Sequence, residues 1–362
     1  MRIGIVSPYS LTLPGGVQSQ VLGIARGLRA LGVDTRVLGP CDGPPPDAGV
    51  TPLGLSIPTA ANGSVAPIAP DASAQLRLLR ALRDEEFDVL HLHEPMAPGP
   101  TMTAAVLKPC PMIGTFHAAG GSLAYRYLRP AVRWLAGRLA VRCAVSADAE
   151  QMASAALGGS YERLFNGIDV ERYSTPKPFD TDQPTTIFFV GRHEPRKGLA
   201  VLLAAMAHLP PEVRLWVAGD GPETESLRRE VAGDPRIEWL GRISETEKIA
   251  RLRGAQAFCA PSLRGESFGI VLLEAMAAGT PVVASELPGY SNVARSGQDA
   301  LLTPPGDAVA LAGALRRVLT DDRLSAALVE SGAERAESFS MARLARRYLE
   351  LSERVVGAPI AR

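Results

Sequence analysis

Short apolar runs alternate with longer amphipathic segments along the whole chain. The runs at Arg2–Ser7, Asp88–His93 and Pro111–Phe116 have the length and composition of buried strands. Between the first two, the apolar positions of Gln18–Leu31 recur with the period of a helix. Strands that alternate with helices pair in parallel, because each helix carries the chain back to the starting edge of the sheet. The pattern therefore predicts an α/β fold.

The alternation continues to the C-terminus with one interruption. Further strands are predicted at Val33–Leu38, Leu139–Ser146, Thr185–Val190, Val213–Gly219, Arg236–Gly241, Gln256–Pro261 and Pro281–Ser285. Further helices are predicted at residues 71–86, at Ala147–Ala156, from Leu199 onward, and at Leu311–Leu319, Arg323–Arg335 and Met341–Val356. The interruption is Cys41–Pro70, whose high content of Pro, Gly and Ala predicts a long loop.

The chain of 362 residues is long enough for two domains that each bury a full core. The Pro- and Asp-rich segment Thr175–Pro184 separates two series of strands and helices, which predicts a linker. We therefore expect one domain over residues 1–170 and a second over residues 171–340. Asp180-Thr181-Asp182 has the spacing of a metal-binding D-x-D motif. No strand precedes it, so we attribute this match to chance.

Composition excludes several classes of function. The 38 basic and 38 acidic residues balance, so no overall positive field attracts nucleic acid. Met1 leads directly into the first strand, so we expect no signal peptide. The most apolar run, Leu199–Leu209, is too short to span a bilayer. The scattered cysteines predict reduced thiols in a cytosolic protein; they are Cys41, Cys110, Cys143 and Cys259.

One stretch, Gly265–Gly279, combines two carboxylates with an apolar helical pattern, G-E-S-F-G-I-V-L-L-E-A-M-A-A-G. The pattern predicts a buried helix over residues 268–278, with Ser267 as its N-cap and Gly279 at its end. Helical geometry would offset Glu266 from Glu274 by about 80° and about two turns. A carboxylate in such an apolar helix needs hydrogen-bond donors, and the hydroxyls of a sugar or a ribose can supply them.

A second motif, Gly191-Arg192-His193-Glu194-Pro195-Arg196-Lys197-Gly198, joins a predicted strand to a predicted helix. Arg192 and Lys197 lie five residues apart in this turn. Fixed cations at such a turn can bind a diphosphate and stabilise the negative charge that develops when it leaves. The alternative is a solvated, charged loop.

Two further signals lie at the ends of N-terminal strands. Pro14-Gly15-Gly16-Val17 precedes a helix, and free N–H groups at a helix start attract anions, although a plain tight turn has the same composition. The loop lacks the G-x-G-x-x-G spacing of dinucleotide folds, so we expect no such cofactor. His117 directly follows the strand Pro111–Phe116, where a side chain faces the ligand crevice of a parallel sheet.

Two other patterns each allow two interpretations. His91 and His93 share one face of a strand, but no third ligand is apparent nearby, so we do not expect a metal site. The helix over residues 71–86 interleaves leucines with arginines, as in a helix that lies on anionic lipid. The acids at 84–86 weaken that field, which favours a surface helix whose leucines pack on the sheet; the residues are Leu76, Leu79, Leu82, Arg77, Arg80 and Arg83.

Together these motifs resemble those of the retaining nucleotide-sugar glycosyltransferases of the two-Rossmann-domain (GT-B) type, family 4, group 1. The matching strings are P-G-G-V, H-L-H-E-P, T-F-H, N-G-I-D-V, G-R-H-E-P-R-K-G and the E-x7-E stretch, in the order of the family and over nearly the whole chain. The resemblance implies two Rossmann-like domains with parallel sheets facing a central cleft. It also implies that the last helix, within residues 341–362, crosses back to the first domain.

Within this family, the strings are most similar to those of actinobacterial enzymes that transfer mannose from GDP-mannose to phosphatidylinositol. The resemblance implies a nucleotide-sugar donor, a phospholipid acceptor and no nucleic-acid partner. It implies a cytoplasmic protein in peripheral contact with the anionic inner face of the cell membrane. No cofactor is required, and a divalent cation such as Mg²⁺ is compatible with the reaction.

The resemblance also implies roles for individual residues. The catalytic residues would be His117, Glu266, Arg192 and Lys197. The donor contacts would be Gly15, Gly16, Arg192, Lys197, Ile243, Glu245, Lys248, Glu266, Ser267, Phe268, Gly269, Ile270 and Glu274. The acceptor contacts would be Tyr9, Gln18, Asn62 and Ser64. The acceptor loop departs from the similar enzymes at Ala61, where they have Tyr, and at Pro67, where they have Arg.

Three alternatives remain at this point. A transferase of the same fold could use another nucleotide sugar, a soluble acceptor or another lipid. A nucleotide-sugar-binding protein without turnover could keep the same motifs. A phosphorylase or epimerase on this fold would need a pyridoxal-type lysine site or a different pair of acids, and neither is apparent.

Overall fold

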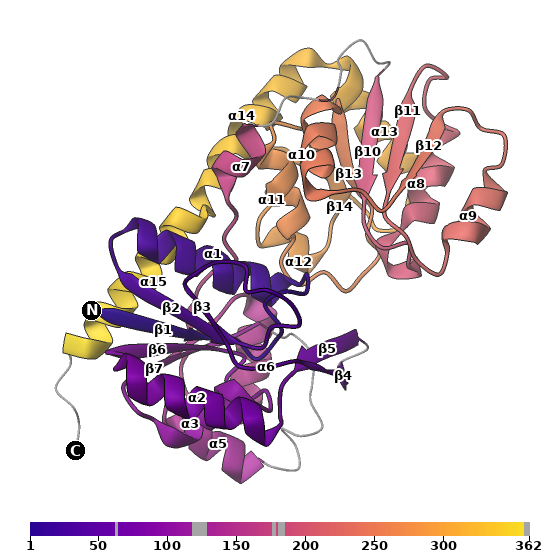
Figure 1. Ribbon diagram of the computed structural model, residues 1–362. Helices are drawn as coiled ribbons and strands as arrows, with labels where there is room; N and C mark the ends of the chain where they lie inside the picture. The colour runs from indigo at the N-terminus through magenta and orange to yellow at the C-terminus, as the bar shows by residue number, and fades with distance from the viewer. Residues whose placement is uncertain (62–63, 118–128, 176–178, 180–184, 358–362) are drawn as a thin grey trace. The chain divides into compact units, whose positions relative to one another are not determined.

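The computed structural model describes residues 1–61, 64–117, 129–175, 179 and 185–357 (Figure 1). The chain divides into two compact units, Met1–Gly167 with Met341–Arg362, and Ile168–Ser340. Each unit is built on its own parallel sheet, which confirms the predicted α/β fold. Residues 176–178 and 180–184 of the expected linker, with the D-x-D spacing, lie outside the described residues.

The first unit contains a seven-stranded parallel sheet in the order β3-β2-β1-β6-β7-β8-β9. Its strands are β1 (Arg2–Val6), β2 (Asp34–Gly39), β3 (Val50–Pro52), β6 (Val89–His93), β7 (Met112–Phe116), β8 (Val141–Ala144) and β9 (Glu162–Arg163). The strand order reverses between β1 and β6, since β2 lies on one side of β1 and β6 on the other. Ligands bind at the carboxyl ends of the strands that flank such a switch point.

Helices cover both faces of this sheet, which is why its strands are apolar throughout (Figure 1). One core packs α1 (Gly16–Ala30) and α15 (Met341–Gly357) on the sheet. The opposite core packs α2 (Ala72–Glu85), α3 (Pro100–Leu107), α5 (Arg129–Gly137) and α6 (Ala147–Leu157). A Cβ atom at Gly27 of α1 would lie 2.6 Å from the Ala345 Cβ, so this glycine lets α1 and α15 approach closely.

Of the three leucines of α2 that were expected to pack on the sheet, only one is buried. Leu82 is buried as expected, but its partner in the core is Leu78. Leu76 and Leu79 are 65% and 42% exposed. Only tertiary packing could choose between these leucines, because apolar residues surround most of the helix.

The prediction of a long loop over Cys41–Pro70 is wrong, because this segment contains three short strands. β3 pairs with β2, while β4 (Ile57–Ala61) and β5 (Ser64–Ile68) form an antiparallel pair. Each strand is short and contains a proline, which obscures the alternating pattern. Pairing with neighbouring strands, rather than local propensity, forms these elements.

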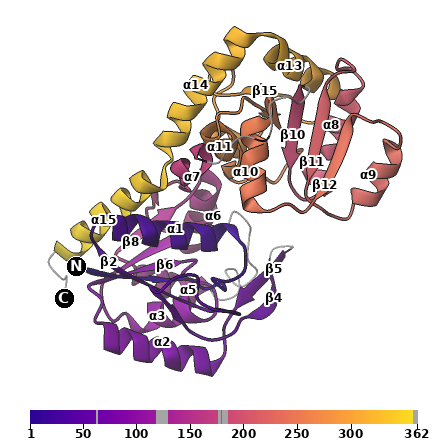
Figure 2. The same cartoon turned by 45° about the horizontal axis from the view of Figure 1, so that its top comes forward.

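The second unit contains a six-stranded parallel sheet in the order β12-β11-β10-β13-β14-β15. Figure 2 shows β10, β11 and β12 side by side in this sheet. Its strands are β10 (Thr186–Val190), β11 (Arg214–Ala218), β12 (Ile237–Gly241), β13 (Ala257–Ala260), β14 (Val282–Ser285) and β15 (Leu301–Thr303). Its helices are α7 (Val170–Ser174), α8 (Leu199–Met206), α9 (Thr224–Glu230), α10 (Glu245–Gly254), α11 (Ile270–Ala277), α12 (Pro288–Ser291), α13 (Ala308–Thr320) and α14 (Asp322–Ser338). The strand order again reverses, here between β10 and β13.

The helix α11 begins later than its sequence predicts. Its N-cap is Gly269, with a φ of 95°, and Ser267 makes no capping hydrogen bond, so the predicted N-cap was wrong. A Cβ atom at Gly269 would lie 3.0 Å from Tyr290 Cδ1. Glycine at this position therefore permits both the left-handed turn and the close packing, and the helix begins directly after it.

The end of α11 is where the sequence placed it. The N–H of Gly279, whose φ is 76°, donates to the Met276 carbonyl at 3.1 Å. The N–H of Thr280 donates to the Ala275 carbonyl at 3.0 Å. These two bonds form a Schellman motif, which explains the requirement for glycine.

A buried carboxylate, that of Asp299, bonds to α14, the helix that packs against α11. Asp299 is 1% exposed and pairs with Arg295 at 2.7 Å, and it accepts a hydrogen bond from Ser331 of α14 at 2.7 Å. A Cβ atom at Gly332 of α14 would lie 3.2 Å from Met276 of α11. Burial raises the pKa of Asp299, but the Arg295 and Ser331 hydrogen bonds outweigh burial and lower it below its ordinary value.

We predict that Asp299→Asn lowers the free energy of unfolding by about 1–3 kcal/mol at pH 7, because the buried ion pair with Arg295 is lost. A carboxylate with a lowered pKa stabilises the fold above its ordinary pKa and loses this effect as pH falls through the folded-state pKa. The difference between variant and wild type in urea unfolding should therefore shrink in acid. Glu330→Gln on the exposed side of α14 is the control; an equal effect there would contradict the prediction.

Candidate functional site

Two loops meet at the switch point of the second unit, because β10 and β13 are neighbouring parallel strands. The short 3-10 helix η1 (Pro195–Lys197) follows β10, and the N–H of Leu263, in the loop after β13, donates to the Arg196 carbonyl at 2.8 Å. Gly198 has a φ of 68°, and a Cβ atom there would lie 1.9 Å from the Pro261 carbonyl oxygen. Glycine therefore lets the cationic turn and the loop of Glu266 come together.

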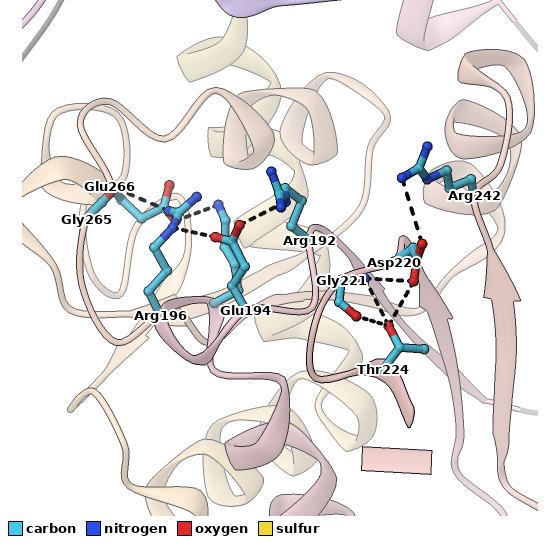
Figure 3. Close-up of polar contacts among 10 residues, drawn as sticks. Arg192, Glu194, Arg196, Asp220, Gly221, Thr224, Arg242, Gly265 and Glu266 are labelled. Atoms are coloured by element: carbon cyan, nitrogen blue, oxygen red, sulfur yellow. Dashed lines mark hydrogen bonds and ion pairs between the residues drawn. The ribbon is translucent and has the colours of Figure 1, made fainter. Parts of the chain in front are cut away.

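Glu266 is the centre of an ion-pair network in these loops (Figure 3). Its Oε1 lies 2.6 Å from Lys197 Nζ and 3.5 Å from Arg196 Nη1, and it accepts a hydrogen bond from Ser262 Oγ at 3.0 Å. Only 12% of the Glu266 side chain is exposed. The predicted pair Lys197 and Glu266 is therefore in direct contact.

Glu194 extends the network to the third cation. Its two carboxylate oxygens lie 2.8 Å from Arg192 Nε and 2.9 Å from Arg196 Nε, as Figure 3 shows. Three cations thus face two carboxylates, which leaves one net positive charge. The Arg192 side chain is 70% exposed at the outer end of this chain of contacts. Such a cluster can bind an anion, and a diphosphate suits the paired cations.

The turn after β11 lies beside this network, and hydrogen bonds within the turn stabilise it (Figure 3). The carboxylate of Asp220 accepts hydrogen bonds from Thr224 Oγ1 at 3.0 Å and from the Gly221 N–H at 2.8 Å. These bonds, with that of Thr224 the largest, lower the pKa of Asp220 below its ordinary value. Arg242 lies 3.8 Å away. A Cβ atom at Gly221 would lie 2.5 Å from the His193 carbonyl oxygen, so the two turns touch.

Glu274, on α11, belongs to a second polar cluster. Its Oε1 accepts a hydrogen bond from the Tyr173 hydroxyl at 2.8 Å, and its Oε2 lies 3.0 Å from Lys248 Nζ. Glu245 lies 2.9 Å from the same ammonium and 3.2 Å from the same hydroxyl. The structure therefore brings together the predicted residues Glu274, Glu245 and Lys248.

The charges of this cluster depend on one another. Burial lowers the pKa of Lys248, but the carboxylates of Glu274 and Glu245 outweigh burial and raise it. Burial raises the pKa of Glu245, but Lys248 outweighs this effect and lowers it. Lys248 and Glu245 therefore favour their charged forms, and the contacts with Tyr173 and Lys248 hold the Glu274 carboxylate in a defined orientation.

The site of the first unit begins at the carboxyl end of β1. The helix α1 starts at Gly16 after Gly15, and no side chain caps it. Gln18 is buried, and a Cβ atom at Gly15 would lie 2.2 Å from its Oε1, so its carboxamide packs against the glycine loop. Tyr9 bridges to Ile68 of β5, and burial, with help from the Glu94 carboxylate, raises the pKa of its phenol.

His117 follows β7 and is held by the residues that end β6. His93 Nδ1 lies 2.8 Å from His117 Nε2, and the main-chain N–H of His117 donates to Glu94 Oε1 at 2.7 Å. Burial lowers the pKa of His117 to about 4, so its ring is neutral at pH 7.

The two strand histidines have separate partners. His91 Nε2 lies 2.7 Å from Ser352 Oγ of α15, while His93 bonds to His117. Among the residues that the structure describes, no group of three or more His, Cys, Asp or Glu side chains is placed to hold a metal ion.

Some predicted contacts lie away from these clusters or outside the described residues. Ser267 and Ile270 are exposed near Glu266, whereas Phe268 is buried against Phe339 at a ring distance of 5.7 Å. Ile243 is half-buried and precedes Ser244, the N-cap of α10. Asn62 lies outside the described residues, as does the side chain of Ser64, whose backbone belongs to β5.

Several residues that complete these clusters were missed at the level of sequence. Arg196 and Glu194 belong to the quoted cationic motif, and four charged residues within three positions of Pro195 were the available signal. Tyr173 carried no local signal, because its partner is 101 residues away and only the fold brings its hydroxyl to a carboxylate. Ser262 lies only 4 residues before Glu266, but that spacing in a loop does not predict the hydrogen bond between them. Gln20 was also missed; its carboxamide exchanges two hydrogen bonds with the Gly167 backbone, at 2.8 and 2.9 Å.

Comparison with known proteins gives consistent matches over the whole chain. Glycosyltransferase Family 4 matches residues 14–172, and Glycosyl transferases group 1 matches residues 171–335. The chain is 40% identical over 368 residues to phosphatidyl-myo-inositol mannosyltransferase of Mycobacterium leprae, covering 98% of this chain and 97% of the relative. The Mycolicibacterium smegmatis protein of the same name is 38% identical over 371 residues, covering 99% and 95%. The crystal structure of Anabaena Alr3699/HepE in complex with UDP has a TM-score of 0.76 at 20% identity, covering 97% and 99%.

We predict that Lys248→Met lowers the free energy of unfolding by about 1–3 kcal/mol, because Glu245 and Glu274 then lack their shared cation. Adding Glu245→Gln should recover part of this loss, since one of the two carboxylates is removed. Urea unfolding of the single variants and the double variant at pH 7 gives the coupling energy. Additivity within about 0.3 kcal/mol would show that the pair does not interact.

Proposed function

Because this chain belongs to the glycosyltransferases of family 4 and group 1, we propose that it transfers mannose from GDP-mannose to a phosphatidylinositol-type lipid. The names and high coverage of the relatives from M. leprae and M. smegmatis support the sugar and the acceptor class. The observation that carries the proposal is the network that joins Glu266 to Lys197, Arg196, Glu194 and Arg192.

The network suits the breaking of a bond between a sugar and a diphosphate. Lys197 and Arg192 are assigned to the diphosphate, which gains negative charge as the bond breaks. Lys197 is paired with Glu266 before the donor binds. A diphosphate would draw Lys197 away from Glu266, and a sugar hydroxyl would then donate to the carboxylate that Lys197 has left. The diphosphate thus replaces Glu266 as the partner of Lys197, and the sugar hydroxyl replaces Lys197 as the partner of Glu266.

The second cluster suits the nucleoside part of the donor. Glu274 is assigned to the ribose hydroxyls, since each of its oxygens has one protein partner and keeps a further lone pair. Glu245 and Lys248 are assigned to the base, with Ile243 beside them. The Glu245 carboxylate can accept hydrogen bonds from the edge of a guanine base, and for this reason we assign GDP as the nucleotide.

The first unit supplies a neutral histidine and a free helix start. His117 is assigned to a hydroxyl of the donor sugar, and the N–H groups at Gly15 and Gly16 are assigned to phosphate. Tyr9, Gln18, Asn62 and Ser64 remain assigned to the acceptor.

We expect transfer with retention of the anomeric configuration. Glu266 and Glu274 are each bound to a lysine, which suits hydrogen-bond acceptors better than nucleophiles. The acceptor oxygen would therefore attack on the face that the diphosphate leaves. The new carbon–oxygen bond forms as the sugar–phosphate bond breaks, and the leaving phosphate takes the acceptor proton.

A lipid acceptor requires contact with a membrane surface, and we place this contact on α2 at the cytoplasmic face. Leu76 and Leu79 project from α2 with Arg80 beside them. The acid Glu85, which would oppose an anionic surface, pairs with Arg2 and with Arg36. Among the described helices, none is long and apolar enough to cross a bilayer.

The transfer assay combines purified protein with GDP-mannose and phosphatidylinositol vesicles, and analyses the lipid by mass spectrometry. We expect a mass increase of one hexose, and an anomeric configuration equal to that of the donor by NMR. Glu274→Ala should reduce the rate by about 100-fold or more, because the ribose contact is lost. Glu286→Ala, an exposed glutamate after β14, should keep the wild-type rate.

Two outcomes would contradict the proposed function. Transfer from UDP-glucose but not from GDP-mannose would show a different donor specificity. A wild-type rate in correctly folded Glu274→Ala would remove the assigned role of the second cluster.

The membrane contact has its own test. We predict that the double variant Leu76→Glu/Leu79→Glu loses most of its co-sedimentation with vesicles that contain phosphatidylinositol, because the exposed leucines no longer enter the lipid interface. The folded state should be unaffected, since neither leucine is part of the core. Val309→Glu, equally exposed on α13, is the control, and equal binding of all three proteins would contradict the prediction.

A further inference from the structure

Two histidines form a buried pair at the ends of neighbouring strands in the first unit. His93 ends β6 and His117 follows β7, and β6 pairs with β7 in parallel. Their rings are stacked, with centroids 5.1 Å apart, and His93 Nδ1 lies 2.8 Å from His117 Nε2. One of these nitrogens must carry the proton of the bond, so the pair fixes the tautomers of both rings.

The burial of His93 decides which nitrogen donates. His93 is 0% exposed, and its other nitrogen, Nε2, has no hydrogen-bond partner. If His93 accepted at Nδ1, its proton would lie on Nε2 as a buried donor without an acceptor. A buried N–H without a partner is rarer and costlier than a buried lone pair. His93 therefore donates its Nδ1–H, and His117 accepts at Nε2.

The same argument assigns the opposite tautomer to the neighbouring His91. Ser352 Oγ donates to the Tyr348 carbonyl at 2.7 Å, so at His91 it acts as the acceptor, over a distance of 2.7 Å. His91 therefore carries its proton on Nε2, and its unpartnered buried nitrogen, Nδ1, again bears a lone pair. Two histidines on one strand face thus hold opposite tautomers.

The remaining nitrogen of His117 is the one that can reach a ligand. If Nε2 is an acceptor in a neutral ring, Nδ1 carries the proton. His117 is half-buried, so part of its side chain is accessible to a ligand. The main chain of His117 is held by Glu94, so both the backbone and the ring are oriented by residues that end β6.

We propose that His93 is a positioning residue that holds His117 as the Nδ1–H tautomer, so that His117 presents one hydrogen-bond donor to a hydroxyl oxygen of the sugar. The assignment of the sugar to His117 rests on the proposed function, whereas the tautomer follows from the protein alone. Burial lowers the pKa of both histidines, which keeps the pair neutral and the direction of the bond defined.

The tautomer can be measured without any substrate. The chain has five histidines, so long-range ¹H–¹⁵N spectra of ¹⁵N-histidine-labelled protein at pH 7 can be assigned by single substitutions. We expect His117 and His93 to be protonated at Nδ1 and His91 to be protonated at Nε2. Protonation of His117 at Nε2, or at both nitrogens, would overturn the proposal.

Substitutions at His93 test the effect on the reaction. His93 bonds to His117 through its Nδ1. The amide nitrogen of asparagine can take the place of this atom, whereas leucine has the shape of asparagine but no donor. We expect His93→Leu to lower kcat for transfer about 10–100-fold with KM little changed, the range typical of a lost supporting hydrogen bond. His93→Asn should stay within about threefold of wild type.

The control is His91→Leu, which removes an equally buried histidine from the same strand but leaves His117 untouched. It should keep the wild-type kcat even if it lowers stability. Equal losses of kcat in His93→Leu, His93→Asn and His91→Leu would show a purely structural role and overturn the proposal. If no donor is turned over while the spectra show Nδ1–H at His117, the proposed function fails and the tautomer assignment stands.

Discussion

The contact on which the site of the second unit depends is the ion pair between Lys197 and Glu266, at 2.6 Å. It joins a turn after β10 to a loop after β13, and these segments are 69 residues apart in sequence. The pair forms because β10 and β13 are adjacent parallel strands, so their carboxyl ends meet at one edge of the sheet. Gly198 contributes by allowing the two backbones to touch.

The candidate site of the first unit also lies at the carboxyl ends of neighbouring parallel strands, but its residues are chemically different. Its switch point lies between β1 and β6, and the residues that follow β6 and β7 hold one another through His93, Glu94 and His117. In the proposed function, the cationic network of the second unit binds the diphosphate, and the neutral histidine pair of the first unit binds a sugar hydroxyl. A glycosyltransferase needs both, because a diphosphate carries charge and a sugar carries only hydroxyls.

Neither carboxylate of the E-x7-E stretch is left to repel a ligand. Glu266 is balanced by Lys197 and Arg196, and Glu274 by Lys248 with the hydroxyl of Tyr173. Such partners hold the two carboxylates in defined orientations. On the proposed function, this organisation requires little rearrangement beyond the exchange of protein partners for those of the donor.

The sequence alone determined the alternation of strands and helices, the end of α11 at Gly279, and the two charged motifs, because these depend on local periodicity and on backbone freedom. It could not determine the start of α11, the strands within Cys41–Pro70 or which leucines of α2 are buried, since packing against distant residues decides them. The partners of the predicted acids were equally inaccessible. Tyr173 reaches Glu274 only because α7 packs beside α11, and such a contact exists once the tertiary structure has formed.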